Sequence, residues 1–382
     1  MSFDLPKQLS RSALAFRGYN STNLGRSSEL LAVPAYAGVM KRRLVEIQEV
    51  AADELKRPVN LVARIEQQTP TGFEDYPDAV ALVYAVELAQ VDLLREVHGL
   101  DIGEAQLAFG YSLGELVALA AAGVVPQNEA IRAPIAMAED CAALAHDVTM
   151  GVVFSRRMAL NEAEAHRLCA EITAEGAGAI AISAVLSPNT LLVLGQHGTL
   201  QRFRDQMSVL CASRVYMRLN DARWPPLHTP IVRQRCIPDR ASVMIQSFTS
   251  HAENARPPVF SLVTGKMTTD VPSIPELLRD WVDRPQRLWD AVVTCLASGV
   301  QCVIHVGPEP NLVPATFQRL AENVQQQKSS GVTGLSIRAL RRMANRPWLA
   351  SLLPQRTALL RAPQVKQVML EDWLLDNAPK AG

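Results

Sequence analysis

The fold of this 382-residue chain is decided by one stretch, Phe109-Gly110-Tyr111-Ser112-Leu113-Gly114-Glu115-Leu116. An apolar run precedes its G-x-S-x-G motif, and an alanine-rich, helix-like run follows it directly. The order strand, tight turn, helix is the setting in which this motif forms a nucleophile elbow. An elbow holds the serine hydroxyl at a helix N-terminus, where the helix dipole and free N–H groups stabilise an oxyanion. Ser112 is therefore the candidate nucleophile of a hydrolase or an acyl transferase.

The composition is that of a globular protein with a sizeable core: 48% of the residues are hydrophobic and the formal net charge is zero. A neutral charge balance argues against a nucleic-acid partner. Residues 1–11 are polar rather than leader-like, and no stretch approaches the ~20 apolar residues of a membrane span. The six scattered cysteines form no C-x-x-C pair, which is typical of reduced thiols. We expect a cytoplasmic protein with no metal site, no cofactor and no membrane span.

Apolar periodicity around the elbow predicts alternating strands and helices. A short strand is expected at 14–18, helices at 36–55 and 79–96, and then the elbow strand. Further strands are expected at 259–263 and 302–306. This alternation favours an α/β core with a parallel sheet.

The pattern changes between residues 148 and 215. Strands are expected at 150–155, 179–185 and 191–195, and helices at 162–175 and 200–209, with a turn at Ser187-Pro188-Asn189. A β-α-β-β-α segment of this length predicts a small inserted ferredoxin-like subdomain. The predicted division is therefore a large subdomain of residues 12–147 and 216–320, a small one of 148–215, and a C-terminal extension of 321–382.

The C-terminal extension is basic, with nine Lys or Arg against four Asp or Glu. Residues 325–331 resemble a flexible linker, and Arg338, Arg341, Arg342 and Arg346 cluster just after it. The cluster fits either the solvated face of a helix packed on the core or an electrostatic handle for an acidic partner.

A serine nucleophile needs a general base, and the chain offers seven histidines. His228 differs from the others because it lies in Trp224-Pro225-Pro226-Leu227-His228-Thr229-Pro230, where prolines on both sides stiffen the loop. From the residues alone, His228 is either the base or a structural histidine.

The elbow and the alanine-rich helix 118–124 resemble those of malonyl-CoA:acyl-carrier-protein transacylases and polyketide-synthase acyltransferase domains. Further similar segments follow in order over residues 12–320: Ser187-Pro188-Asn189, His228-Thr229-Pro230, 259–265, 284–289 and Val306-Gly307-Pro308. The resemblance implies a divergent member with an α/β-hydrolase-like large subdomain, a parallel sheet and an inserted ferredoxin-like subdomain. It also implies Ser112 as nucleophile and His228 as base.

The same resemblance implies the oxyanion hole. Tyr19 falls where the family's first loop has a glutamine whose backbone N–H contacts the oxyanion, and Leu113 supplies the second backbone N–H. A loop near Gly307 is expected to orient the histidine. Of the two candidates there, His305 and Asn311, Asn311 is taken as the candidate orienter.

Three positions depart from the malonyl-selective pattern. Met137 falls where those members carry an arginine for the substrate carboxylate, and Arg132, five residues earlier, belongs to another helix face. Tyr111 and Leu227 also replace residues typical of malonyl-selective members. These substrate-binding candidates predict an uncharged acyl group, acetyl or a longer fatty acyl. The alternative is a shifted register near Pro134, with some other arginine in this role.

The leading hypothesis is an acyltransferase that moves an acyl group from acyl-CoA, or from an acyl carrier protein, to the phosphopantetheine thiol of an acyl carrier protein. The setting would be fatty-acid or polyketide-type biosynthesis. One alternative is a trans-acting thioesterase, in which water attacks the same acyl-enzyme. The other is a non-catalytic docking component of a synthase.

Overall fold

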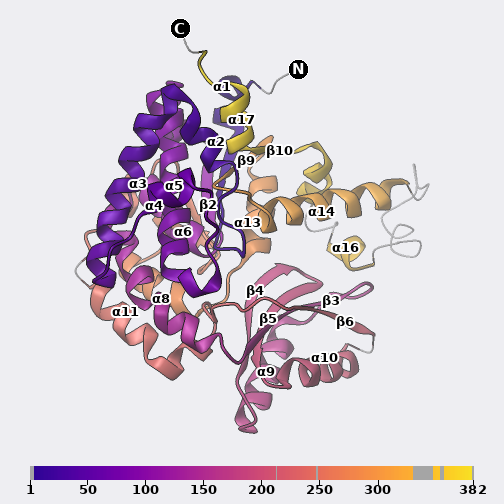
Figure 1. Cartoon of the computed structure of the whole chain (residues 1–382). Coiled ribbons are helices and arrows are strands. Elements are labelled where there is room, and N and C mark those ends of the chain that lie inside the picture. Colours follow the sequence, from indigo (N-terminus) through magenta and orange to yellow (C-terminus); the bar gives the residue numbers. More distant parts are fainter. Residues whose placement is uncertain (1–3, 212, 247, 330–346, 353–356, 381–382) are drawn as a thin grey trace.

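Two sheets organise the computed structural model, which describes residues 4–211, 213–246, 248–329, 347–352 and 357–380 (Figure 1). The large sheet has the order β10-β9-β1-β2-β7-β8, and its pairings are parallel except for that of β8. Its strands are β1 (Ser12–Phe16), β2 (Leu107–Gly110), β7 (Val259–Ser261), β8 (Lys266–Met267), β9 (Cys302–Val306) and β10 (Lys366–Met369). The parallel α/β core expected from the sequence is confirmed.

The register of the central strands brings three loops to one edge of the large sheet. Phe16 at the end of β1 lies beside Gly110 at the end of β2 and beside Val306 at the end of β9. In parallel α/β sheets, ligands bind outside the carboxyl ends of the strands. The loops that follow these strands are therefore the place to look for a site.

The helices divide between the two faces of the large sheet. The core on the side of α3, α5 and α6 is continuous, and α5 is buried from Tyr76 to Leu94. In Figure 1, α3, α4, α5 and α6 lie together on one side, whereas α13 and α14 lie on the other. The helices of the large subdomain are α1 (Leu5–Gln8), α2 (Ser27–Ala32), α3 (Pro34–Leu55), α4 (Leu61–Glu66), α5 (Tyr76–Glu96), α6 (Leu113–Ala121), α7 (Gln127–Ala130), α8 (Arg132–Leu144), α11 (Ile237–Ile245), α12 (Ile274–Asp283) and α13 (Leu288–Ala297).

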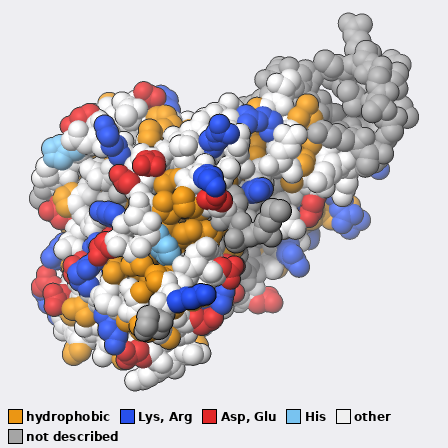
Figure 2. Space-filling view, turned by 90° about the horizontal axis from the view of Figure 1, so that it is seen from above, with side chains coloured by type: hydrophobic (Ala, Val, Ile, Leu, Met, Phe, Trp, Pro, Cys, Tyr) orange, Lys and Arg blue, Asp and Glu red, His pale blue; other side chains and the backbone are white. Residues whose placement is uncertain are grey.

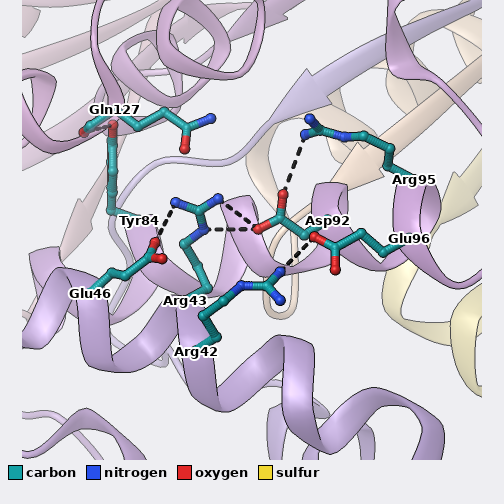
Figure 3. A network of polar contacts seen from close by, with 8 residues as sticks. All are labelled: Arg42, Arg43, Glu46, Tyr84, Asp92, Arg95, Glu96 and Gln127. Atoms are coloured by element: carbon teal, nitrogen blue, oxygen red, sulfur yellow. Dashed lines mark hydrogen bonds and ion pairs between the residues drawn. The ribbon is translucent and has the colours of Figure 1, made fainter.

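Polar contacts join α3 to α5 (Figure 3). Arg43 on α3 lies 2.8 Å from Asp92 on α5, and the Asp92 side chain is only 4% exposed. Glu46 bonds the same guanidinium at 2.8 Å. Closer to the N-terminus of α5, the Tyr84 hydroxyl donates to the carbonyl oxygen of Gln127 at 2.6 Å. These contacts satisfy polar groups that would otherwise be costly inside the helix layer.

The small sheet is antiparallel, with the order β4-β5-β3-β6. It is formed by β3 (Val148–Ser155), β4 (Ile180–Ser187), β5 (Thr190–Gln196) and β6 (Val215–Asn220), and its helices are α9 (Glu162–Ala174) and α10 (Thr199–Leu210). Both helices lie on one face of the sheet (Figure 1). This β-α-β-β-α-β order is ferredoxin-like, as expected, although the last strand continues five residues beyond the predicted boundary at 215.

The C-terminal segment joins the large sheet instead of forming a separate extension. Helix α14 (Leu312–Ser329) continues through most of the stretch predicted as a linker. After α16 (Pro347–Leu352), β10 pairs in parallel with β9, and α17 (Leu370–Asp376) follows it. The arginine cluster at 338–346 lies outside the described residues. The prediction missed β10 because four residues at a sheet edge carry little periodic signal.

The described helices include none that is long and apolar enough to cross a membrane. Basic and acidic side chains alternate over the face drawn in Figure 2, so this face carries no broad patch of one sign. That distribution agrees with the zero formal net charge.

Candidate active site

Ser112 occupies a strained turn between β2 and α6. Its backbone has φ 56° and ψ −120°, a conformation that L side chains rarely adopt. Gly110 and Gly114 permit the turn by close approach: a methyl group on Gly110 would overlap the carbonyl of Gly114. The N–H of Tyr111 donates to the carbonyl oxygen of Phe16 at 3.0 Å, which fastens the turn to β1. The predicted nucleophile elbow is therefore present as local geometry.

His228 lies within hydrogen-bond reach of the serine. The distance from Nε2 to Ser112 Oγ is 2.7 Å, and the distance from Nδ1 to the carbonyl oxygen of Trp281 is also 2.7 Å. A carbonyl oxygen only accepts, so Nδ1 carries the proton in the neutral ring and Nε2 is free to accept the serine hydroxyl. The predicted pair thus comes together, with the tautomer that a general base requires.

The group that orients His228 is the C-terminal end of α12, not the predicted Asn311. A helix leaves its last carbonyls without internal partners, and the partner position for Trp281 is Pro285, which has no N–H. His228 uses two of these carbonyls, because its backbone N–H also donates to Val282 at 2.8 Å. The side chain of Asn311 instead accepts the N–H of Leu312. The prediction of Asn311 is therefore wrong.

Two further residues hold the elbow, and both escaped the sequence prediction. The indole N–H of Trp281 donates to the carbonyl oxygen of Ser112 at 2.9 Å, and the side-chain oxygen of Gln286 accepts the Ser112 N–H at 3.2 Å. The backbone of Gln286 also bonds Ser183 and Val185 on β4, at 2.8 and 2.9 Å. Gln286 therefore connects the small subdomain to the elbow. Neither role has a local signal in the sequence.

Burial sets the electrostatics of the site. Burial lowers the pKa of His228 to about 4, although the bond to the Trp281 carbonyl works against this shift. Burial also raises the pKa of Glu115, one turn along α6, to about 7. His228 is thus neutral at physiological pH and able to accept a proton.

The residues of the two predicted oxyanion contacts lie close to Ser112: Leu113 follows it in the chain, and Tyr19 lines the same pocket. Leu113 is the first residue of α6, so its N–H has no carbonyl within the helix to bond. Tyr19 follows Gly18, where a methyl group would come within 3.1 Å of Ser112 Cβ. Arg17 holds this loop by donating to the carbonyls of Gly18 and Thr22 at 2.8 and 3.2 Å. The positions suit the predicted role, which stays a prediction.

A pocket of about 330 Å³, here the main pocket, opens at Ser112 and runs between the small sheet and α14. Tyr111 and Leu227 line it, as predicted for substrate-binding residues, and so do His305 and Asn311. Most of the remaining wall is apolar: Met150 and Val152 on β3, Leu192 and Leu194 on β5, and Leu312 and Val313 on α14. The main pocket can hold an extended, weakly polar ligand.

Met137 is not among the residues that line the main pocket. It is 2% exposed and lines a small hollow together with Ser112 and Leu113. Arg132 lies away from this hollow and pairs with Asp53 at 2.9 Å and with Glu54. The residues described around the hollow include no arginine, so the shifted-register alternative gains no support from Arg132.

No protein-family model matches the sequence, and no curated protein matches it. The structure, however, resembles many solved ones. The malonyl-CoA:acyl carrier protein transacylase of Xanthomonas oryzae superposes with a TM-score of 0.63 at 20% identity, covering 81% of this chain and 91% of that one. The acyltransferase domain from module 8 of the salinomycin polyketide synthase gives 0.62 at 20%, covering 94% and 78%.

A third structure is a malonyl-transacylase in complex with a type II polyketide-synthase acyl-carrier protein. Its TM-score is 0.59 at 20% identity, covering 96% of this chain and 99% of that one. At these identities the likeness concerns the fold. The chain therefore has the two-subdomain α/β fold of malonyl-CoA:acyl-carrier-protein transacylases and polyketide-synthase acyltransferase domains, as the sequence resemblance implied.

Proposed function

We propose that the protein transfers an acyl group from one thioester to another through an ester on Ser112. The observation that carries the proposal is the chain of hydrogen bonds from Ser112 Oγ to His228 Nε2 and from His228 Nδ1 to the Trp281 carbonyl, each 2.7 Å long. A nucleophile, a base and an orienting group in this order are the requirements of covalent acyl transfer. The likeness to acyltransferases of the same fold supports the same reaction class.

In the first half-reaction, Ser112 Oγ attacks the thioester carbonyl carbon while its proton moves to His228 Nε2. The N–H groups of Leu113 and Tyr19 stabilise the oxyanion. The carbon–sulfur bond then breaks, and the leaving sulfur takes the proton from His228. In the second half-reaction, the acceptor thiol gives its proton to His228 and attacks the ester carbon. The carbon–oxygen bond breaks, Ser112 recovers the proton, and a new thioester leaves. The negative end of α12 stabilises the imidazolium of His228 that forms within each half-reaction.

The donor that we propose is an acyl-CoA, or an acyl carrier protein, whose acyl group is uncharged. Met137 lies where the resemblance places an arginine for the malonyl carboxylate. Arg17, which lines the main pocket, already donates to the carbonyls of Gly18, Thr22 and Pro308. A buried carboxylate without a partner costs several kcal/mol. We expect malonyl-CoA to acylate Ser112 more slowly than acetyl-CoA. The reverse order in an intact-mass time course would refute the proposed uncharged donor and leave the proposed acyl transfer intact.

The acceptor that we propose is the phosphopantetheine thiol of an acyl carrier protein, in fatty-acid or polyketide-type biosynthesis. The main pocket shares Val152, Leu186, Leu312 and Ala315 with an outer groove of about 840 Å³. Three exposed arginines line this groove: Arg156, Arg218 and Arg319. Carrier proteins are generally acidic, so a basic groove that leads to the nucleophile suits such a partner.

Reversing two of these charges should weaken the carrier protein's binding. We expect Arg156→Glu with Arg218→Glu to raise the KM for the carrier protein by about tenfold at low salt, and by less at high salt, because the attraction between exposed charges is screened. The KM for a pantetheine-length thiol should stay unchanged. Arg167→Glu on α9, whose partners Glu164 and Glu171 lie on the helix surface, is the matched control. An unchanged KM in the double variant would place the docking surface elsewhere.

The rate of acylation should be nearly independent of pH above about pH 5. Burial lowers the pKa of His228 to about 4, so acid removes the base by protonating Nε2 only near that pH. Below it, the acylation rate measured by rapid quench should fall about tenfold per pH unit. Glu115→Gln removes the neighbouring carboxyl whose pKa is about 7, so any remaining inflection belongs to His228. An inflection at the ordinary histidine value of 6.5 would contradict the expectation.

The decisive experiment follows the fate of the acyl group. Incubation with a panel of acyl-CoAs and intact-mass measurement tests for the ester, and the ester is then mixed with a holo carrier protein. Acyl transfer to the carrier supports the proposal. Release of free acid at the same rate with or without the carrier would identify a thioesterase. No ester with any donor would leave only a non-catalytic role.

A further inference from the structure

Two hollows of very different size meet at Ser112. The main pocket continues into the outer groove, whose arginines are exposed, so this route connects the serine with solvent. The second hollow, here the inner chamber, measures only about 10 Å³. Its wall opposite Ser112 and Leu113 is formed by Tyr76 and Val80 on α5 and by Pro134, Met137 and Cys141 on α8.

The inner chamber is closed on the side of α5 and α8. Tyr76 and Val80 are each 3% exposed, Met137 is 2% exposed and Cys141 is 1% exposed. A thioester at Ser112 has two branches, the acyl group and the sulfur with its long arm. Because the arm must reach solvent, it occupies the main pocket, and the acyl group is left to the inner chamber.

The inner chamber has room for one small group. A volume of about 10 Å³ accommodates roughly one probe sphere, the size of a water molecule or a methyl group. Its wall residues stand one turn apart on two packed helices, Tyr76 and Val80 on α5 and Met137 and Cys141 on α8. Extra methylenes in such a close-packed site force side chains off their rotamers or shift the backbone.

The chemistry of the wall also favours a small apolar group. A thioether, a thiol, a valine and a proline face the cavity region, and burial raises the pKa of the Cys141 thiol to about 12, which keeps it uncharged. The edge-to-face pair of Tyr19 and Tyr76, with ring centroids 4.8 Å apart, lies where the chamber meets the main pocket. This pair limits sideways growth of the group.

We infer that the acyl group accepted by Ser112 is short, of acetyl size, and that Met137 with its neighbours on α5 and α8 sets this limit. The inference rests on the proposed acyl transfer and narrows its substrate class. It excludes a medium or long fatty acyl, which the sequence left open. Met137 acts here as a specificity-determining residue that fills space, in addition to carrying no charge.

A chain-length series tests the inference. Rates of ester formation are measured by intact mass with acetyl-, butyryl-, hexanoyl- and octanoyl-CoA. We expect acetyl to react at least about tenfold faster than hexanoyl, because one unaccommodated methylene in an apolar site already costs about tenfold. An octanoyl or hexanoyl rate equal to the acetyl rate would overturn the inference and leave acyl transfer intact. No ester with any donor would overturn the proposed function as well.

Enlarging the chamber tests the role of Met137 directly. Met137→Ala should raise the ratio of butyryl or hexanoyl to acetyl rates by about tenfold. Arg132→Ala, at the first residue of the same helix and away from the chamber, where the arginine pairs with Asp53 and Glu54 on α3, is the matched control and should leave this ratio unchanged. Val80→Ala opens the same chamber from α5 and serves where Met137→Ala does not fold. A general loss of stability would lower all rates together, so an unchanged ratio in folded variants of both residues would overturn the inference.

Discussion

Ser112→Ala is expected to abolish ester formation with every acyl-CoA, and His228→Gln to lower its rate on the order of 10²- to 10⁴-fold. The serine supplies the oxygen of the ester, so its loss removes the reaction itself. The histidine moves a proton across the 2.7 Å bond to Oγ, which a glutamine cannot do at neutral pH. In the wild-type protein, the carbonyl of Trp281 fixes the orientation of the His228 ring through Nδ1. We therefore attribute the expected loss of rate in His228→Gln to the missing proton transfer more than to a misplaced side chain.

The measurement is the growth of the ester mass peak over time at saturating donor. Ser208→Ala on α10 is the matched control, since its hydroxyl donates to the carbonyl of Arg204 and accepts the N–H of Val215, both within the small subdomain. Melting curves establish that each variant is folded. An ester on Ser112→Ala at the wild-type rate would place the nucleophile elsewhere, and an unimpaired His228→Gln would remove the histidine from the mechanism.

The meeting of Ser112 with His228 was predictable because the elbow is a local signal and the family resemblance pointed to His228. The elbow places Ser112 through a strand, two glycines and a helix that are adjacent in sequence, and His228 lies between prolines. Trp281 and Gln286 contribute through a backbone carbonyl and an amide whose partners lie far away in sequence. A backbone carbonyl has no residue-type signature, whereas the polar side chain of Asn311 is a visible candidate in the sequence.

The elements of the fold were likewise predictable where their signal is local, and not where they depend on distant contacts. Long periodic segments such as α3 and α5 were expected close to their observed bounds, because an apolar face repeated over many residues is a strong signal. Strand β10 escaped prediction because its place depends on the register with β9, which is set in three dimensions. The linker expected at 325–331 is helical through 329, since Gln and Lys are good helix formers when the helix packs on a core.

The elbow itself should tolerate no side chain at either glycine. Neither Gly110 nor Gly114 has a positive φ, so the requirement is one of space. A methyl group on Gly110 would overlap the backbone of Gly114, and one on Gly114 would overlap the carbonyls of Phe16 and Arg17. These neighbours are backbone atoms of α6, of β1 and of Arg17 just after β1, which cannot move without breaking the alignment that holds Ser112.

We therefore expect Gly110→Ala and Gly114→Ala each to lower the free energy of unfolding by more than about 3 kcal/mol, or to yield no soluble protein. Gly38→Ala is the matched control, because Gly38 lies on the exposed side of α3 with no atom within 4 Å of the added methyl. It should stabilise the protein by up to about 1 kcal/mol, since alanine loses less backbone entropy in a helix. Urea unfolding of the three variants measures both the expected losses and the expected gain in the free energy of unfolding. If Gly110→Ala were as stable as wild type, β2 and α6 would not approach as closely as the strained Ser112 requires, and the short distance from Ser112 to His228 would lose its structural cause.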